Sequence, residues 1–121
     1  MSSCYDNGTI ENATVNSISP QEARAYHGRA GVEFVDPRPA DAIAATTGKI
    51  PGARLISLDD VEAGNLPPAF NDRTLHVVAT CQAGPMASRT AKAFAKLGFA
   101  NVNWVEGGTQ AWVDAGYETV R

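Results

Sequence analysis

The sequence predicts one α/β domain, doubly wound, with a parallel sheet of about five strands and helices on both faces. Short apolar, β-rich segments alternate with helical segments about five times, and the links between them are short. This alternation is typical of parallel strands joined by helical crossovers. Residues 75–79 are almost continuously apolar, as expected for a strand that helices cover on both sides. We therefore place this segment at the centre of the sheet.

Length and composition limit the classes of protein to which the chain can belong. The 121 residues are enough for one domain with a core and too few for two. A hydrophobic content of 44% with a net charge of −3 describes a soluble globular protein without a basic field, which argues against a nucleic-acid partner. No run approaches the roughly 18 apolar residues of a membrane span. The first residues lack the basic and apolar regions of a secretory signal, so we expect a cytoplasmic protein with no membrane partner.

The N-terminal half is expected to contain three strands and three helices. Residues 1–14 are polar and predict a flexible leader, so the domain should span residues 15–121. Ser19, Pro20 and Glu22 mark a helix start, with serine as the N-cap and glutamate closing a capping box. The expected strands are residues 15–18, 32–35 and 54–56, and the expected helices are residues 20–26, residues 39–45 and a brief one capped by Ser57.

The C-terminal half places one long helix directly after the central strand. Gly84 and Pro85 break the strand pattern, and proline suits the first position of a helix. Apolar residues then recur at helical spacing until Gly98, which can take the left-handed conformation that ends a helix. Residues 101–105 are the last expected strand, and residues 106–108 turn the chain into a closing helix that contains Trp112.

Cys81 is the candidate for chemistry. It follows the predicted central strand, at the edge where open α/β sheets bind ligands. The only other cysteine, Cys4, lies in the polar leader, and no CxxC pair is present. His27 and His76 are far apart in the sequence, so neither a metal site nor a cofactor is expected. A buried, inert cysteine at a strand end is the structural alternative.

The residues around Cys81 suit a reactive thiol. The thiolate is the nucleophilic form of cysteine, and backbone N–H groups at a helix N-terminus stabilise it. Gly84 allows a positive φ, so that successive amides of the loop can point inward. The same N–H groups could hold an anionic group delivered to the sulfur. We therefore interpret the turn after the central strand as an active-site loop.

Four stretches resemble a single-domain rhodanese, a sulfurtransferase, in their order and spacing. They are FVDPR at residues 34–38, GKIPGA at residues 48–53, CQAG at residues 81–84 and VEGGTQAW at residues 105–112. The resemblance covers roughly residues 16–119. It implies a rhodanese-like doubly wound domain around a parallel five-stranded sheet.

The resemblance also implies a reaction. Cys81 would take a sulfane sulfur from a donor, such as thiosulfate or another persulfide or polysulfide, and become a persulfide. It would then pass the sulfur to a thiol or cyanide acceptor, with a sulfur-relay protein as a further kind of partner. Asp36 and Arg38 would tie neighbouring loops, and Gly107 and Gly108 would form the turn behind the site. The candidate substrate-binding positions are Gln82, Ala83, Gly84, Pro85, Met86, Ala87 and Arg89.

The loop departs from the family pattern in charge. The sixth loop position, usually arginine or lysine, is Met86, and Gln82 replaces a common arginine. Pro85 removes an amide, and Lys49 stands where histidine is usual. Arg89 is the nearest cation and could either fold back toward the loop or remain solvated. These changes argue against thiosulfate as the preferred donor.

Two other functions remain open on the sequence. A non-catalytic binding or regulatory module would be compatible with the neutral loop, although it would not require Cys81 and Gly84. Phosphatases and arsenate reductases of the same fold have a loop one residue longer, with an arginine six positions after the cysteine. This chain has Ala87 at that position, which argues against them.

Overall fold

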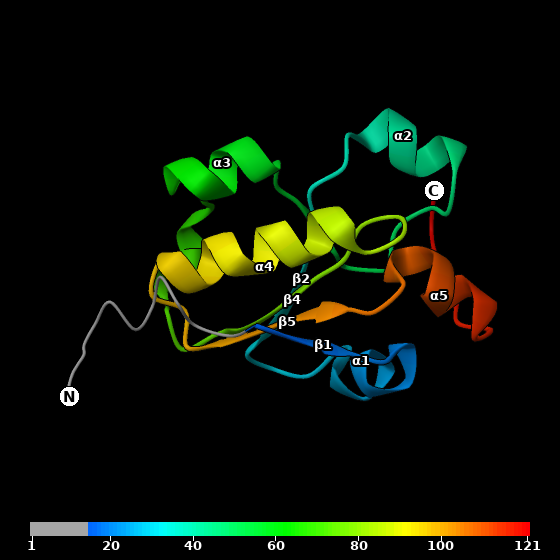
Figure 1. Ribbon diagram of the computed structural model, residues 1–121, viewed down its shortest axis with the longest axis horizontal. Helices are drawn as coiled ribbons and strands as arrows, with labels where there is room; N and C mark the ends of the chain where they lie inside the picture. Colours follow the sequence, from blue (N-terminus) through cyan, green and yellow to red (C-terminus); the bar gives the residue numbers. More distant parts are fainter. Residues whose placement is uncertain (1–14) are drawn as a thin grey trace.

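A five-stranded, all-parallel sheet forms the centre of the protein (Figure 1). The computed structural model describes residues 15–121, so the predicted leader and Cys4 lie outside the described residues. The strands follow the order β1-β5-β4-β2-β3. Their bounds are Asn16–Ile18 (β1), Val32–Asp36 (β2), Arg54–Leu55 (β3), His76–Ala79 (β4) and Asn101–Val105 (β5). This architecture confirms the fold class predicted from the sequence, including the central position of β4.

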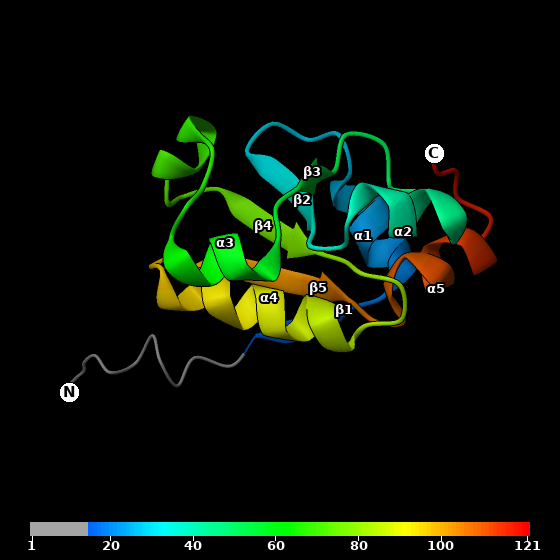
Figure 2. The same cartoon turned by 90° about the horizontal axis from the view of Figure 1, so that it is seen from above.

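Helices pack on both faces of the sheet. α3 and α4 cover one face, and α1 and α5 contribute to the core on the other (Figure 1). α2 lies near the carboxyl ends of the strands (Figure 2), where the Arg121 side chain donates to the Ala44 carbonyl at its end. The helices are α1 (Pro20–Tyr26), α2 (Ala40–Ala45), α3 (Leu58–Ala63), α4 (Pro85–Lys96) and α5 (Gly108–Asp114), together with a 3₁₀ helix at Pro68–Asn71. Among residues 15–121, no helix has the length and apolarity needed to cross a membrane.

Strand β4 is buried because its side chains enter two separate cores. Val77 and Ala79 pack into the core beneath α3 and α4. Val78, which points to the opposite face, joins the core that contains Trp112 of α5. Alternate residues of a strand point to opposite faces of a sheet, so both faces of β4 are covered. Packing on both faces of β4 therefore holds in place the two residues that follow it, Thr80 and Cys81.

Local signals explain most of the helix boundaries. The Ser19 hydroxyl accepts the Glu22 N–H at 3.1 Å, and the Glu22 carboxylate accepts the Ser19 N–H at 2.9 Å, which is the predicted capping box. The sequence did not predict the 3₁₀ helix at Pro68–Asn71. That helix forms because it buries Phe70 completely against the rings of Phe94 and Phe99.

Candidate active site

Cys81 lies two residues after the end of β4, at the carboxyl edge of the sheet. The loop that it begins connects β4 to α4, and Figure 2 shows this loop beside the start of α5. The side chain is 4% exposed, and Cys81 is a free cysteine. The strand and the long helix that follows it thus present a single shielded thiol where the sheet ends.

Two backbone N–H groups point at the sulfur of Cys81. Sγ accepts the Gly84 N–H at 3.0 Å and the Ala87 N–H at 3.3 Å. The first contact depends on Gly84, whose φ is +124°, a conformation that residues with a Cβ rarely adopt. Pro85, the first residue of α4, has no N–H to contribute. The loop therefore surrounds the sulfur with donors that bond more strongly to a charged acceptor than to a neutral one.

The first turn of α5 forms the back wall of the loop. The Thr109 N–H donates to the Cys81 carbonyl at 2.7 Å, and the Gln110 N–H donates to the Gln82 carbonyl at 3.0 Å. Gly108 lies so close to both carbonyls that a Cβ there would be 2.7 and 2.6 Å from their oxygens. The described peptide bonds are trans, so the N–H that follows each carbonyl points the opposite way. The N–H groups of Gln82 and Ala83 thus point away from α5.

A buried ion pair supports this back wall from below. Asp36 is fully buried, and its carboxylate accepts Arg38 Nη2 at 2.7 Å and Nε at 3.0 Å. Arg38 also donates to the Thr47 hydroxyl at 3.1 Å and to the Gly48 carbonyl at 3.4 Å. A further contact at 3.5 Å reaches the hydroxyl of Thr109. Arg38 thereby connects the end of β2 and the loop after α2 with the start of α5.

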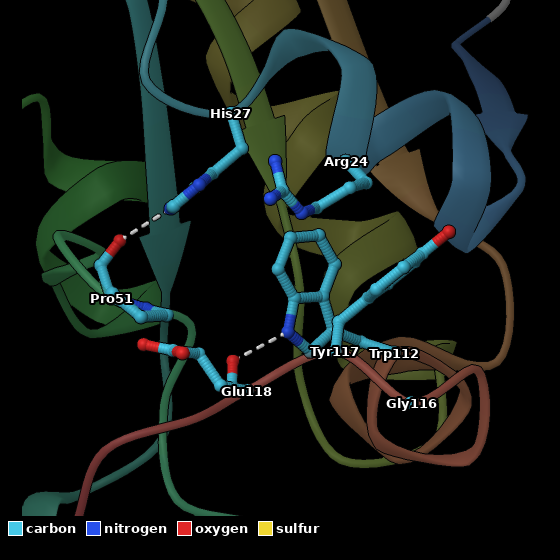
Figure 3. Close-up of a pocket in the computed structure, with 7 residues that line it drawn as sticks. All are labelled: Arg24, His27, Pro51, Trp112, Gly116, Tyr117 and Glu118. Atoms are coloured by element: carbon cyan, nitrogen blue, oxygen red, sulfur yellow. Dashed lines mark hydrogen bonds between the residues drawn. The ribbon is translucent and has the colours of Figure 1, made fainter.

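A hollow of about 380 Å³ lies on another part of the surface, between α1 and the C-terminal segment (Figure 3). Its lining consists of Arg24, His27, Pro51, Trp112, Gly116, Tyr117 and Glu118. The Trp112 ring N–H donates to the Glu118 carbonyl at 2.8 Å, and Nε2 of His27 bonds to the Pro51 carbonyl at 2.7 Å. These polar groups are therefore already paired within the protein. None of the residues predicted for the site lines this hollow, and the sequence carried no signal for it.

The rhodanese-like domain family model matches residues 19–115. The chain belongs to this family. Among similar solved structures, a Rhodopseudomonas palustris protein of unknown function, described as a possible tyrosine phosphatase, has 28% identity and a TM-score of 0.79, with 90% of this chain and 87% of that chain covered. A rhodanese homolog from Thermus thermophilus has 25% identity and a TM-score of 0.60, with coverage of 79% and 99%. A human single-domain sulfurtransferase has 22% identity and a TM-score of 0.66, with coverage of 84% and 97%, and supports the fold alone. No protein of curated function matches the sequence significantly.

The mouth of the loop in this rhodanese-like domain is neutral. Gln82, Ala83, Pro85 and Met86 are exposed, and the Met86 side chain is 41% exposed. Arg89 is also exposed, and its side chain forms no hydrogen bond or ion pair with any residue from 15 to 121. No basic side chain is thus held at the loop.

Lys49, which stands where the family usually has histidine, is bonded within its own loop. The Lys49 ammonium donates to the Ala53 carbonyl at 3.1 Å, within its own loop. Within the described part of the chain, no three histidine, cysteine or acidic side chains form a cluster that could hold a metal ion.

Proposed function

We propose that the protein is a sulfurtransferase that carries sulfur as a persulfide on Cys81. The observation that supports this most directly is the shielded Cys81 sulfur, which accepts the N–H groups of Gly84 and Ala87 at the carboxyl edge of β4. In this mechanism the Cys81 thiol must be reduced between turnovers. The cytoplasm keeps thiols reduced, so we propose a cytoplasmic protein. Membership of the family supports the class of reaction, and the geometry of the loop supports Cys81 as the place where it occurs.

The proposed reaction has two displacements at sulfur. The Cys81 thiolate attacks the sulfane sulfur of the donor, a new S–S bond forms at Sγ, and the donor's own bond to that sulfur breaks. The donor leaves with the electron pair, as a thiolate or, from thiosulfate, as sulfite. A thiol or cyanide acceptor then attacks the outer sulfur, the Sγ–S bond breaks and the Cys81 thiolate is restored. The sulfur moves as a neutral atom, so no external oxidant or reductant is needed.

The backbone of the loop is suited to hold the intermediate. A persulfide is anionic at its outer sulfur, and unpaired N–H groups in a turn bind anions. The N–H groups of Gln82 and Ala83 point away from α5 and have no acceptor among the described residues. We assign them to the outer sulfur, while Gly84 and Ala87 hold Sγ. Each such bond to a charged group is worth about 1.5–3 kcal/mol.

The neutral mouth favours donors with little charge. Thiosulfate is a dianion, and a loop without a cation offers it no charge-assisted side-chain bond. The flexible thioether of Met86 instead favours contact with apolar groups. We therefore propose a low-molecular-weight persulfide or a persulfide on a partner protein as the donor, ahead of thiosulfate.

Intact-mass analysis after incubation with polysulfide or thiosulfate tests this function. The wild-type protein should gain one sulfur, which a reductant removes and an acceptor thiol takes up. The Cys81→Ser variant should gain none and should keep its fold, because the change is nearly isosteric. Cys4→Ser is the matched control and should behave as the wild type. Sulfur retained by the Cys81 variant, or none gained with any donor, would contradict the proposal, and the second result would favour a binding module.

A phosphatase is a second candidate because of the possible tyrosine phosphatase among the similar structures. A phosphate ester would bring two negative charges to the loop, and residues 82–88 contain no basic side chain to meet them. A bidentate arginine is the usual partner for such a group. We expect no hydrolysis of p-nitrophenyl phosphate above that of Cys81→Ser, and Cys81-dependent hydrolysis would reverse the order of the two candidates.

A further inference from the structure

Two buried threonine hydroxyls connect the Asp36–Arg38 ion pair to the peptide that follows Cys81. Thr80 and Thr109 are both fully buried, and their Oγ1 atoms lie 2.8 Å apart. Arg38 Nη2 lies 3.5 Å from Thr109 Oγ1, and Thr80 Oγ1 lies 3.4 Å from the Cys81 carbonyl oxygen. The outer two contacts are long, and the central one is short. Together they form a continuous row from the guanidinium to the loop.

The chemistry of the two ends fixes the direction of every proton in this row. A guanidinium can only donate, so Thr109 Oγ1 accepts from Arg38. A carbonyl can only accept, so the Thr80 hydroxyl donates to Cys81. Each hydroxyl has a single proton, and the Thr109 hydroxyl must therefore donate to Thr80. Both hydroxyls are thus satisfied, with all donors pointing toward the Cys81 carbonyl.

The row acts on the same carbonyl oxygen as the backbone of α5. The Thr109 N–H already donates to it at 2.7 Å, and the Thr80 hydroxyl adds a second donor. Hydrogen bonds arranged in one direction polarise one another in a low-dielectric interior. Polarising a peptide carbonyl strengthens the N–H of the same peptide as a donor, and here that N–H belongs to Gln82. It points away from α5 because the peptide is trans.

We infer that Thr109, acting through Thr80, is a positioning residue for the reaction at Cys81. Its hydroxyl orients and polarises the peptide between Cys81 and Gln82, so that the Gln82 N–H meets the outer sulfur. The inference rests on the proposed sulfur transfer for its catalytic consequence. Its structural part, the fixed orientation of the loop around Sγ, does not depend on the identity of the substrate.

The test cuts the row at either hydroxyl without changing the shape of the core. Thr109→Val keeps the backbone N–H and nearly the volume of the side chain, and removes only the hydroxyl. Thr80→Val removes the hydroxyl that contacts the Cys81 carbonyl. Thr109→Ser restores the hydroxyl. Thr90→Val is the matched control, because Thr90 is also fully buried and its hydroxyl has one partner among residues 15–121, the Met86 carbonyl within α4, at 2.8 Å.

Two measurements are made on each variant. Steady-state sulfur transfer from a polysulfide to cyanide gives kcat and KM, and the rate of alkylation by iodoacetamide at neutral pH reports the loop around Sγ. Thr109→Val and Thr80→Val should lower kcat about tenfold, the effect of one lost hydrogen bond, with KM within about a factor of two. Both should also slow alkylation severalfold. Thr109→Ser and Thr90→Val should keep the wild-type kcat and alkylation rate. In urea unfolding, Thr90→Val should lose about as much stability as Thr109→Val and Thr80→Val.

The outcomes separate this inference from the proposed function. If the wild type transfers sulfur and Thr109→Val and Thr80→Val match Thr90→Val in kcat and alkylation, the positioning role is wrong and the transfer stands. A loss of kcat in Thr90→Val equal to that in Thr109→Val would also overturn the positioning role, because the removal of any buried hydroxyl would then lower kcat. If the wild type transfers no sulfur, the proposed function fails. The alkylation rates alone then test the positioning role. Slow alkylation in Thr109→Val and Thr80→Val but not in Thr90→Val supports the role, and any other pattern contradicts it.

Discussion

Replacing Gly108 by alanine should displace the active-site loop while leaving the domain folded. Gly108 has a φ of +66°, and an added Cβ would lie 2.6 Å from the Gln82 carbonyl oxygen and 2.7 Å from that of Cys81. Real Cβ contacts are essentially never below 3.0 Å, so the loop and α5 must separate by at least 0.4 Å, the difference between 2.6 and 3.0 Å. The obstructing atoms are backbone, so no side-chain rotation can relieve the contact.

Two contributions make up the expected loss of stability. The left-handed conformation costs a residue with a Cβ about 1–2 kcal/mol, and the forced contact adds about 1–3 kcal/mol. Their sum is smaller than the roughly 5–15 kcal/mol by which most domains are stable, so the variant should fold. Gly28→Ala measures the first contribution alone, because Gly28 has a φ of +84° and a Cβ there would meet nothing within 4 Å. The difference between the two variants in urea unfolding therefore gives the contact energy.

Activity is the sharper measurement. A displacement of about 1 Å at a reacting group can lower a rate by about a hundredfold, so a shift near 0.4 Å should lower kcat for sulfur transfer by about sixfold. Gly28→Ala should keep kcat within about twofold, since its site is far from the loop. If Gly108→Ala loses no more activity and no more stability than Gly28→Ala, then α5 does not hold the Cys81 loop in the way derived from these contacts.

Two other substitutions test the charges of the site. Met86→Arg should lower KM for thiosulfate by roughly one to two decades with little change in kcat, since the new cation binds ground and transition states alike. It should also make turnover more sensitive to salt, and an unchanged KM, or an equal fall in Met86→Gln, would mean that the missing cation is not what limits thiosulfate binding. Arg38→Leu should lower the free energy of unfolding by about 3–5 kcal/mol, because it leaves the Asp36 carboxylate buried without its partner. Arg54→Leu, which breaks an exposed pair with Glu33, should lower it by no more than about 1 kcal/mol, and equal losses in the two variants would show that burial does not set the strength of the Asp36 pair.

The sequence predicted the elements of this fold because their signals are local. A capping box at Ser19 and a proline at the start of α4 each act within a few residues, and the structure has both. The resemblance to the family then implied a parallel five-stranded sheet, which the structure confirms. The 3₁₀ helix at Pro68–Asn71 was missed because it forms to bury Phe70 against α4, a contact with residues distant in the sequence.

The candidate site was less accessible to sequence reasoning than the fold. Cys81 and Gly84 could be found because a lone cysteine and a glycine in a turn are visible in the sequence itself. Thr80 and Thr109 carried no such signal, because a threonine at a strand end and another at a helix start are ordinary choices for those positions. Their hydroxyls come together only when β4 and α5 pack, 29 residues apart in the sequence. Long-range hydrogen bonds of this kind require the three-dimensional structure.

In the proposed sulfur transfer, holding the transferred sulfur and recognising the donor would be separate tasks, performed by different atoms of the loop. The sulfur meets backbone N–H groups, whose directions depend on Gly84 and on the contact between Gly108 and the loop carbonyls. The donor would meet exposed side chains such as Met86, which form no part of that backbone geometry. A change of side chain at the mouth can therefore alter which donors bind while the backbone keeps its ability to stabilise a persulfide. The absence of charge at the loop mouth would therefore indicate a different sulfur donor and not a loss of sulfur transfer. Substitutions at the mouth should alter KM, and substitutions at the back wall should alter kcat.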